Sequence, residues 1–271
     1  MPIHICTTCG TSYPESAEPP NGCPICEDER QFVPRSGQGW ITPARLAASH
    51  ANAWRRLEPD LFEVHTCPGF AIGQRALLLR MPTGNILWDC IALFDEATEA
   101  LLRALGGLSA IAISHPHYYT CMQDWARAFD CPIHLHIGDA DWVMRRDPLI
   151  RHWEGDTLSI APGVTLLRLG GHFPGGTVLH WAEGAARRGA LLSGDIVQVA
   201  ADLNRVSFLW SYPNMMPLSA TTVRRIADRL RPLPFERIYG AFTGRQVMSG
   251  GANVVQQSAA RYVELLQGEQ S

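Results

Sequence analysis

The sequence predicts a mixed α/β fold, with two packed β-sheets flanked by helices and a small cysteine-rich module in front. Strand patterns followed by helix patterns occur in two successive parts of the chain, as expected for two sheets whose outer faces are covered by helices. The 271 residues, 46% hydrophobic and 18% charged, can form a substantial core and are not those of a disordered chain. We expect the module to cover residues 1–36 and the larger domain to cover residues 37–271.

The first part of the larger domain begins with a helix signal. Thr42 as N-cap and Pro43 at the first helical position predict an amphipathic helix over Thr42–Leu57. Strands are expected next, and then helices that alternate with strands. The expected strands are Leu61–Thr66, Arg75–Met81, Ile86–Asp89, 109–113 and 132–137, and the expected helices are 95–105, 120–129 and 139–146.

The second part repeats this organisation with a strand-rich stretch that ends in helices. Its expected strands are Thr157–Ile160, Val164–Leu169, Thr177–Trp181, Ala190–Leu192 and 236–239, and its expected helices are 219–230 and 252–266. The segment Asn204–Pro217 contains Trp210, Tyr212 and Met215. We expect it to be a substrate-facing cover, a packed connection or an oligomer contact, since aromatic residues and methionine serve all three.

All 23 basic residues are arginine, and the chain has no lysine. The absence of lysine excludes a lysine Schiff base and a phosphate-binding loop of the Walker type. A net charge of -3 without runs of like charge predicts neither a nucleic-acid nor a membrane partner. The start lacks a signal-peptide pattern and no apolar stretch approaches 18 residues, so we expect a cytoplasmic protein.

Four cysteines near the start have the spacing of metal ligands. They form two C-x-x-C pairs, Cys6 with Cys9 and Cys23 with Cys26, separated by 13 residues. Two such turns can direct four thiolates to one tetrahedral site. The pattern resembles a zinc ribbon or the knuckles of rubredoxin, and the short gap favours structural zinc over iron. Two disulfides or four unrelated thiols are the alternatives, and a closed site would be structural or dock a protein partner.

Two further sets of possible ligands are expected to have no metal. The remaining cysteines lack a ligand spacing and are expected to be small buried hydrophobic residues; they are Cys67, Cys90, Cys121 and Cys131. His134 and His136 are two apart within an expected strand. No other motif accompanies this pair, so we expect it to be structural.

His115 and His117 are a stronger candidate pair. They follow the apolar strand 108–113, and a helix pattern begins at Thr120, so both imidazoles lie at the carboxyl end of a strand. Residues two apart on an extended chain point the same way, and Pro116 stiffens the segment. The two histidines are therefore expected to be able to chelate one metal ion.

Other motifs flank this pair in a fixed order along the chain. Asp89 ends an early strand, Asp156 lies in a turn before a strand, His172 lies in Gly-Gly-His-Phe-Pro-Gly-Gly, and Asp195 ends Ser-Gly-Asp. Together with the histidine pair, this order resembles the metallo-β-lactamase superfamily over residues 58–268. The resemblance implies an αββα sandwich with the metal site at one edge of the two sheets.

The resemblance also implies a set of ligands. These would be His115, His117 and His172, with Asp195 reaching the metal from the second half of the fold. Asp89 would be a supporting carboxylate that orders the ligand loop; an ordinary turn residue at the end of a strand is the alternative.

The sequence departs from the family at the second metal. The usual motif is H-x-H-x-D-H, but here Tyr119 replaces the aspartate and Thr120 the last histidine. Phe242 stands where a late ligand histidine is expected. The remaining donors suffice for one zinc ion with an open, water-filled position. Tyr118 or Tyr119 could donate a hydrogen bond to developing charge, although a tyrosine beside a ligand loop more often packs.

Three functions are compatible with such a site. The first is a mononuclear zinc hydrolase of a small ester, thioester, lactone or phosphoester, in which Asp195 ligates the metal or accepts a proton from water. The second is a non-haem iron enzyme similar to sulfur dioxygenases, because His115, His172 and Asp195 form a 2-His-1-carboxylate set. The third is a non-catalytic descendant that binds a metal or ligand and a protein partner. A small-molecule substrate is expected for the enzymes, and a homo-oligomer is an open alternative.

Overall fold

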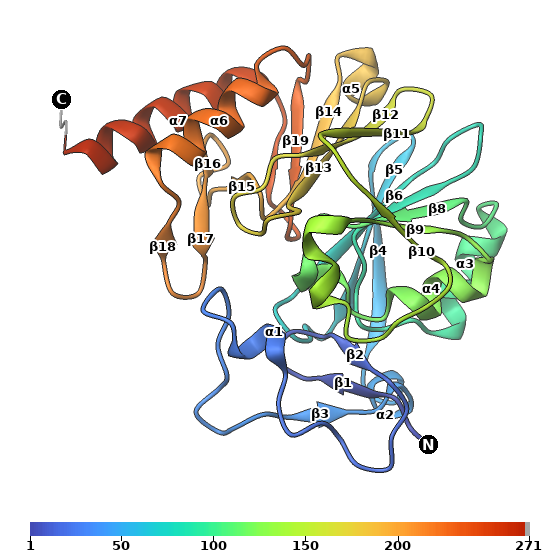
Figure 1. Cartoon of the computed structure of the whole chain (residues 1–271). Helices are drawn as coiled ribbons and strands as arrows, with labels where there is room; N and C mark the ends of the chain where they lie inside the picture. Colours follow the sequence, from blue (N-terminus) through green and yellow to red (C-terminus); the bar gives the residue numbers. More distant parts are fainter. Residues whose placement is uncertain (269–271) are drawn as a thin grey trace. The chain divides into compact units, whose positions relative to one another are not determined.

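The computed structural model describes residues 1–268 of the chain, which forms two compact units, Met1–Trp153 and Glu154–Ser271 (Figure 1). Each unit contains one large β-sheet and its own helices. The mixed α/β class predicted from the sequence is confirmed. The cysteine-rich segment is part of the first unit, and its standing as a separate module over residues 1–36 stays a prediction.

The first unit is built on a seven-stranded sheet with the order β10-β9-β8-β7-β6-β5-β4. Its strands are β4 (Ala51–Glu58), β5 (Leu61–Cys67), β6 (Arg75–Leu79), β7 (Ile86–Trp88), β8 (Ala110–Ala112), β9 (Ile133–His136) and β10 (Ile150–Trp153). Neighbours from β4 to β7 are antiparallel, and neighbours from β7 to β10 are parallel. Because parallel neighbours need crossover connections, α3 (Glu96–Ala104) and α4 (Met122–Phe129) fall between the parallel strands.

The predicted helix over Thr42–Leu57 is wrong beyond its first turn. Thr42 does cap a helix, accepting a hydrogen bond from the Arg45 amide at 3.4 Å, but α2 covers only Pro43–Ala47. The rest of the segment is β4, which pairs with β5 along its length. Pairing satisfies the backbone groups of β4 against a buried neighbour, and this tertiary contact overrides the helical spacing of the apolar residues.

A second difference lies near the end of the first unit. Residues 139–146 were expected to be helical, but the structure has the 3-10 helix η2 (Ile137–Trp142) followed by bends. The strand β10 was not expected there. The side chain of His136 caps η2 by accepting a hydrogen bond from the Gly138 amide at 3.0 Å, and its ring packs on Trp153. This position agrees with the structural role expected for the pair in β9.

The N-terminal segment forms a small three-stranded sheet with the order β2-β1-β3. Its elements are β1 (His4–Cys6), β2 (Ser12–Tyr13), the short helix α1 (Pro24–Glu27) and β3 (Trp40–Ile41). Ile5 and Leu46 of this segment pack with Ala92 and Leu93 in one buried cluster, and the four cysteines form another with Tyr13 and Ile25. Trp142 and Met144, which follow β9, pack against them. The segment therefore shares its core with the stretch that follows β9 in the same unit.

The second unit is built on a six-stranded sheet with the order β11-β12-β13-β14-β19-β20. Its strands are β11 (Thr157–Ala161), β12 (Val164–Arg168), β13 (Thr177–Trp181), β14 (Ala190–Gly194), β19 (Arg237–Gly240) and β20 (Gln246–Val247). Its helices are α5 (Gly184–Arg187), α6 (Ala220–Leu230) and α7 (Gly251–Gln267). Apart from β20 and the short α5, these elements were expected from the sequence.

Helices α6 and α7 lie side by side and contribute to the core of the second unit (Figure 1). Their apolar faces pack with the sheet in one cluster of buried residues, which includes Leu167, Val178, Leu191, Ile226, Ile238 and Val255. Two small hairpins were not predicted: β15 (Gln198–Val199) with β16 (Val206–Ser207), and β17 (Leu209–Ser211) with β18 (Met216–Pro217). These hairpins contain most of the segment for which the sequence left three roles open.

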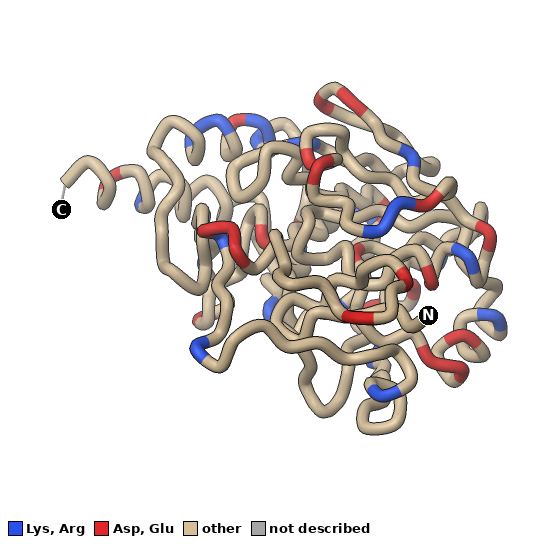
Figure 2. The backbone as a smooth tube through the Cα atoms, turned by 60° about the horizontal axis from the view of Figure 1, so that its bottom comes forward, with Lys and Arg blue, Asp and Glu red and all other residues tan. Residues whose placement is uncertain are grey.

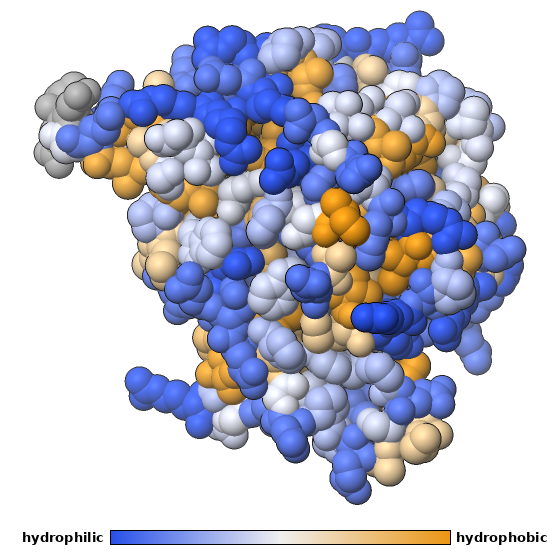
Figure 3. Space-filling view, in the orientation of Figure 1, coloured by the Kyte–Doolittle hydropathy of each residue, from blue (hydrophilic) through white to orange (hydrophobic). Residues whose placement is uncertain are grey.

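Charged residues of both signs are interspersed along the chain (Figure 2). Hydrophilic residues cover most of the face shown in Figure 3, and apolar residues appear there in small groups. Within residues 1–268, no helix combines the length and the hydrophobicity needed to cross a bilayer.

One ion pair lies inside the sheet of the first unit. The Arg75 guanidinium donates to the Glu63 carboxylate at 2.6 Å, and both side chains are fully buried. Glu63 also meets the half-exposed Arg55 at 2.8 Å. The pair joins β5 to the first residue of β6.

We expect Glu63→Gln to lower the free energy of unfolding by about 3–5 kcal/mol, because it leaves the buried Arg75 charge without its carboxylate. Glu99→Gln is the matched control: it makes the same chemical change in the exposed pair with Arg103 on α3 and should cost less than about 1 kcal/mol. Urea unfolding of both variants measures the difference. Equal losses would contradict a structural role of the buried pair.

Candidate metal centres

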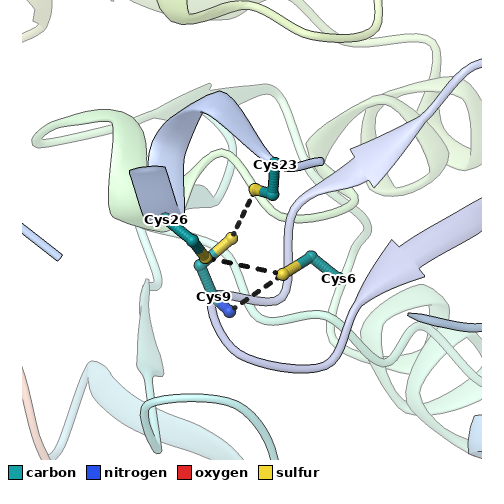
Figure 4. Close-up of side chains that lie close together, drawn as sticks. All are labelled: Cys6, Cys9, Cys23 and Cys26. Carbon is teal, nitrogen blue, oxygen red and sulfur yellow. Dashed lines mark hydrogen bonds between the residues drawn. The ribbon is translucent and has the colours of Figure 1, made fainter. Parts of the chain in front are cut away.

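The four N-terminal cysteines converge on one point (Figure 4). Their sulfur atoms all lie within 4.8 Å of one another, and all four side chains are buried. Cys6 Sγ lies 3.6 Å from Cys26 Sγ, and Cys9 Sγ lies 3.6 Å from Cys23 Sγ. A disulfide bond is about 2.05 Å long, and all four cysteines are free thiols, which excludes the two-disulfide alternative. The two separations of 3.6 Å have another explanation. They are close to the ~3.8 Å edge of a tetrahedron with zinc–sulfur bonds of about 2.3 Å.

Hydrogen-bond donors surround these sulfur atoms. The Tyr13 hydroxyl donates to Cys23 Sγ at 3.0 Å, and the Gln38 side-chain amide donates to Cys6 Sγ at 3.0 Å. The Cys9 backbone amide also donates to Cys6 Sγ, at 3.5 Å. Such donors stabilise thiolates and orient them as ligands. Tyr13 and Gln38 were not identified from the sequence, because no ligand spacing marks them.

The acid–base properties of the cluster also fit a cation. Hydrogen bonding to neighbouring cysteine sulfurs lowers the pKa of Cys6 and of Cys23. The same contacts raise the pKa of Cys9 and of Cys26. Four buried thiols this close cannot all ionise by themselves, because each negative charge opposes the next. A divalent cation at the centre would compensate the charges and allow all four thiolates to form.

The other four cysteines are thiols that lie outside this cluster. Cys90, Cys121 and Cys131 are buried, as expected, and burial raises the pKa of each. The expectation is wrong for Cys67, which is exposed at the end of β5.

His115 and His117 follow β8 in the first unit and are both buried. Their ring centroids lie 5.1 Å apart. His115 is extended, but His117 lies in the 3-10 helix η1 (Pro116–Tyr118), so a tight turn, and not an extended chain, brings the rings together. The Ser114 hydroxyl contacts His115 Nδ1 at 2.8 Å. This contact leaves Nε2 of His115 as the atom suited to a metal.

Asp89 orders the histidine loop. Its carboxylate accepts a hydrogen bond from the Ser114 backbone amide at 2.8 Å, and the side chain is buried. Asp89 itself has a positive φ of 62°, a conformation that aspartate tolerates better than most residues. The structure thus favours the supporting role over that of an ordinary turn residue.

Tyr119 is also buried, and burial raises the pKa of its phenol. Its hydroxyl donates to the Asp139 backbone carbonyl at 3.4 Å. This contact gives Tyr119 a packing function within the first unit. The catalytic role expected for Tyr119 stays a prediction.

His172 is held in the second unit by the loop after β12. Gly170 and Gly171 have φ values of 66° and 89°, which favour glycine, and a Cβ on Gly171 would lie 3.0 Å from a methyl group of Leu218. His172 Nδ1 lies 2.7 Å from the Trp210 backbone carbonyl. A carbonyl can only accept, so Nδ1 carries the proton. In the neutral imidazole, Nε2 then has the lone pair that a metal requires.

Asp195 follows β14 in the same unit and is buried. Burial raises the pKa of its carboxyl group to about 7. The Tyr212 hydroxyl donates to the Asp195 backbone carbonyl at 2.8 Å, and the Tyr212 ring packs against His172. The hairpin β17–β18 and its turn therefore hold both candidate ligands of the second unit. A packed connection is the role, among the three left open, that these contacts support.

The residues that orient the histidines were not singled out from the sequence. Ser114 adjoins the ligand motif, but no spacing rule assigns it a contact. Trp210 was named only as part of an aromatic segment, and it acts through its backbone carbonyl, for which side-chain patterns carry no signal. Phe242, at the expected place of a further histidine, follows β19 and is half-buried.

No family model matches the chain. It is 46% identical over 271 residues to the uncharacterized protein YmaE of Bacillus subtilis (strain 168), covering 99% of this chain and 98% of YmaE. The structure is similar to that of the metallo-β-lactamase DIM-1, with a TM-score of 0.58 and 11% identity, and the match covers 79% of this chain and 97% of that one. It is also similar to the metallo-β-lactamase SMB-1, with a TM-score of 0.54 and 16% identity, and this match covers 80% of this chain and 97% of that one.

It is also similar to TTHA1623 in a di-iron-bound form, with a TM-score of 0.51, 24% identity, and coverage of 67% of this chain and 92% of that one. Identities this low establish the fold alone. The similarity to YmaE extends over nearly the whole of both chains. The chain therefore belongs to the same family as YmaE and has the metallo-β-lactamase fold.

Proposed function

We propose that the protein is a metal-dependent hydrolase in which His115, His117 and His172 bind one catalytic zinc ion and the Asp195 carboxylate accepts a proton from the attacking water. The observation that carries this proposal is the chemistry of the donor set: three imidazoles and one carboxylate, all buried, that together could hold a metal ion. The similarity to metallo-β-lactamases extends over about four fifths of the chain and so includes residues of both units.

Hydrogen bonds support this reading of the donors. The Trp210 carbonyl fixes the His172 tautomer with Nε2 deprotonated, as a metal ligand must be. Ser114 contacts Nδ1 of His115, so both histidines use the same ring atom for their orienting contact. Partners of this kind are typical of histidines that bind metals. A metal bound nearby would displace the proton that burial holds on Asp195.

A zinc ion in such a site lowers the pKa of its water to about 7 and polarises the carbonyl or phosphoryl oxygen that it touches. The residues of the chain supply the remaining functions. Three histidine ligands would leave the fourth position of the metal open for water. The Asp195 carboxylate would accept the proton of this water, whose oxygen forms the new bond to the carbonyl carbon or phosphorus. The bond to the leaving oxygen or sulfur then breaks, and the leaving group takes up the proton.

The replaced residues argue for one metal ion. Tyr119, Thr120 and Phe242 occupy the positions at which the family usually has ligands of the second metal. A phenol, a hydroxyl and a phenyl ring replace a carboxylate and two imidazoles, which are far better ligands. The substrate class that we propose is a small ester, thioester, lactone or phosphoester in the cytoplasm.

The cysteine cluster is proposed to bind a second zinc ion with a structural function. Four thiolates fill a tetrahedral coordination shell and leave no open position for a substrate. The sulfur separations and the donors at Tyr13 and Gln38 fit such a site.

Iron at the histidine site is the second candidate. One structural relative is described as a di-iron-bound form, and two histidines with Asp195 make a set suited to non-haem iron. In that case the reaction would be an oxygen-dependent oxidation of a persulfide. A non-catalytic protein that retains the metal or a ligand is the third reading.

Elemental mass spectrometry of the purified full-length protein should find about two zinc ions per chain, one for each donor set. The double variant His115→Ala, His117→Ala should retain about one, because the cysteine set is intact. His134→Ala is the matched control, since it removes a histidine of the same spacing pattern from β9, and its zinc content should equal that of the unchanged protein. A zinc content that the double variant does not change would contradict the histidine site.

The zinc-loaded protein should hydrolyse at least one substrate in a panel of aryl esters, thioesters, lactones and phosphoesters. Activity should fall to the level of the chelator-treated protein in His172→Ala, because that variant removes a ligand, and should survive in His134→Ala. Absence of turnover across the panel would count against the hydrolase. Iron content together with oxygen uptake on a persulfide would favour the second candidate.

A further inference from the structure

One buried side chain connects the two donor sets of the first unit. The amide nitrogen of Gln74 donates to the Cys9 backbone carbonyl at 2.7 Å and to the His117 backbone carbonyl at 3.0 Å. Gln74 is 4% exposed and immediately precedes β6. Both acceptors are carbonyls, so the amide nitrogen must face them. The side chain thus joins the backbone of a cysteine ligand to the backbone of a histidine ligand.

Further contacts hold the first cysteine turn against the histidine loop. The backbone amide and the hydroxyl of Ser12 both donate to the Thr120 carbonyl, at 2.9 and 2.7 Å. Gly10, which follows Cys9, has a φ of 80°, and a Cβ there would lie 3.2 Å from Ala92 and 3.5 Å from the Gln74 amide nitrogen. The first cysteine turn is therefore packed directly on the segment from His117 to Thr120.

The N-terminal segment has only a small core. Its strands are two or three residues long, and the four cysteines make up most of one buried cluster. The other cluster adds Ile5 and Leu46, which pack on Ala92 and Leu93. Segments with so small a core usually depend on a metal for folding. A cation at the cysteines would therefore fix the position of the Cys9 carbonyl, and the absence of the cation would release it.

We propose that Gln74 is a positioning residue that couples the cysteine metal site to the histidine loop, so that metal at the cysteines increases the metal affinity of the histidine site. This inference rests on the proposed function of the histidine site. The coupling acts through hydrogen bonds to the backbone of the loop, which sets the separation of the His115 and His117 rings. By linkage, metal at the histidines strengthens binding at the cysteines by the same factor.

The first test is zinc titration of the full-length protein against a chromogenic chelator. Gln74→Leu should weaken zinc binding at the histidine site by about 10–100-fold, the range for loss of an outer-shell partner, and leave the cysteine site filled. Gln123→Leu is the matched control: Gln123 is equally buried, and its side-chain amide exchanges hydrogen bonds with Arg145, which belongs to neither donor set. Equal losses in both variants would overturn the proposal, since they would reflect general destabilisation.

A double-mutant cycle tests the coupling itself. Cys23→Ser should weaken zinc binding at the histidine site by about 5-fold or more when Gln74 is present. The same change should have little further effect in the Gln74→Leu protein, because the connection is already broken. Effects that simply add would show that the two sites are independent.

Hydrogen exchange followed by mass spectrometry separates this proposal from the proposed function. The amides of Tyr118 and Tyr119 close the histidine turn through the carbonyls of His115 and Pro116, at 3.0 and 3.1 Å. They should exchange faster in Gln74→Leu and at the unchanged rate in Gln123→Leu, whether or not the histidines hold metal. If the histidine site binds no metal but the exchange differs in this way, the proposed function fails and the positioning role of Gln74 stands. Unchanged exchange in Gln74→Leu would overturn the positioning role.

Discussion

Four cysteine sulfur atoms lie buried within 4.8 Å of one another, and the repulsion that they would have as thiolates is the constraint on which the N-terminal segment depends. Charge of this density is stable in an interior only when a cation compensates it. The N-terminal strands are too short to form an independent core, so the cluster gives them their shape. Through Gln74 and Ser12, that shape is transmitted to the loop of His115 and His117.

Hydrogen bonds within the protein orient the candidate histidine ligands before any metal binds. The Asp89 carboxylate orders the loop, Ser114 contacts one imidazole, and the Trp210 carbonyl sets the tautomer of another. Orienting partners of this kind reduce the entropy that a ligand loses when it binds metal. Tyr119, Thr120 and Phe242 stand where ligands of a second metal were expected, and none of these hydrogen bonds involves them. The fold is thus compatible with a site that has fewer metal ligands than the usual metallo-β-lactamase motif.

The sequence predicted most of the fold, because apolar periodicity and turn residues carry a strong local signal. It failed at Thr42–Leu57, where pairing with β5 overrides helical spacing, and at β10 and the two small hairpins, whose strands are too short for periodicity to reveal. Motif order identified the candidate ligands. It could not identify Gln74, Tyr13 or Trp210, because their contacts depend on tertiary structure and in one case on a main-chain atom.

The contact between His172 and residue 210 has a consequence for how relatives of this protein can differ. The acceptor is a main-chain carbonyl, so any amino acid at position 210 supplies it as long as the hairpin keeps its backbone path. The tautomer of His172 therefore does not depend on the side chain at position 210. Substitutions at this position can alter the size and polarity of the hairpin side chain, while His172 keeps its proton on Nδ1.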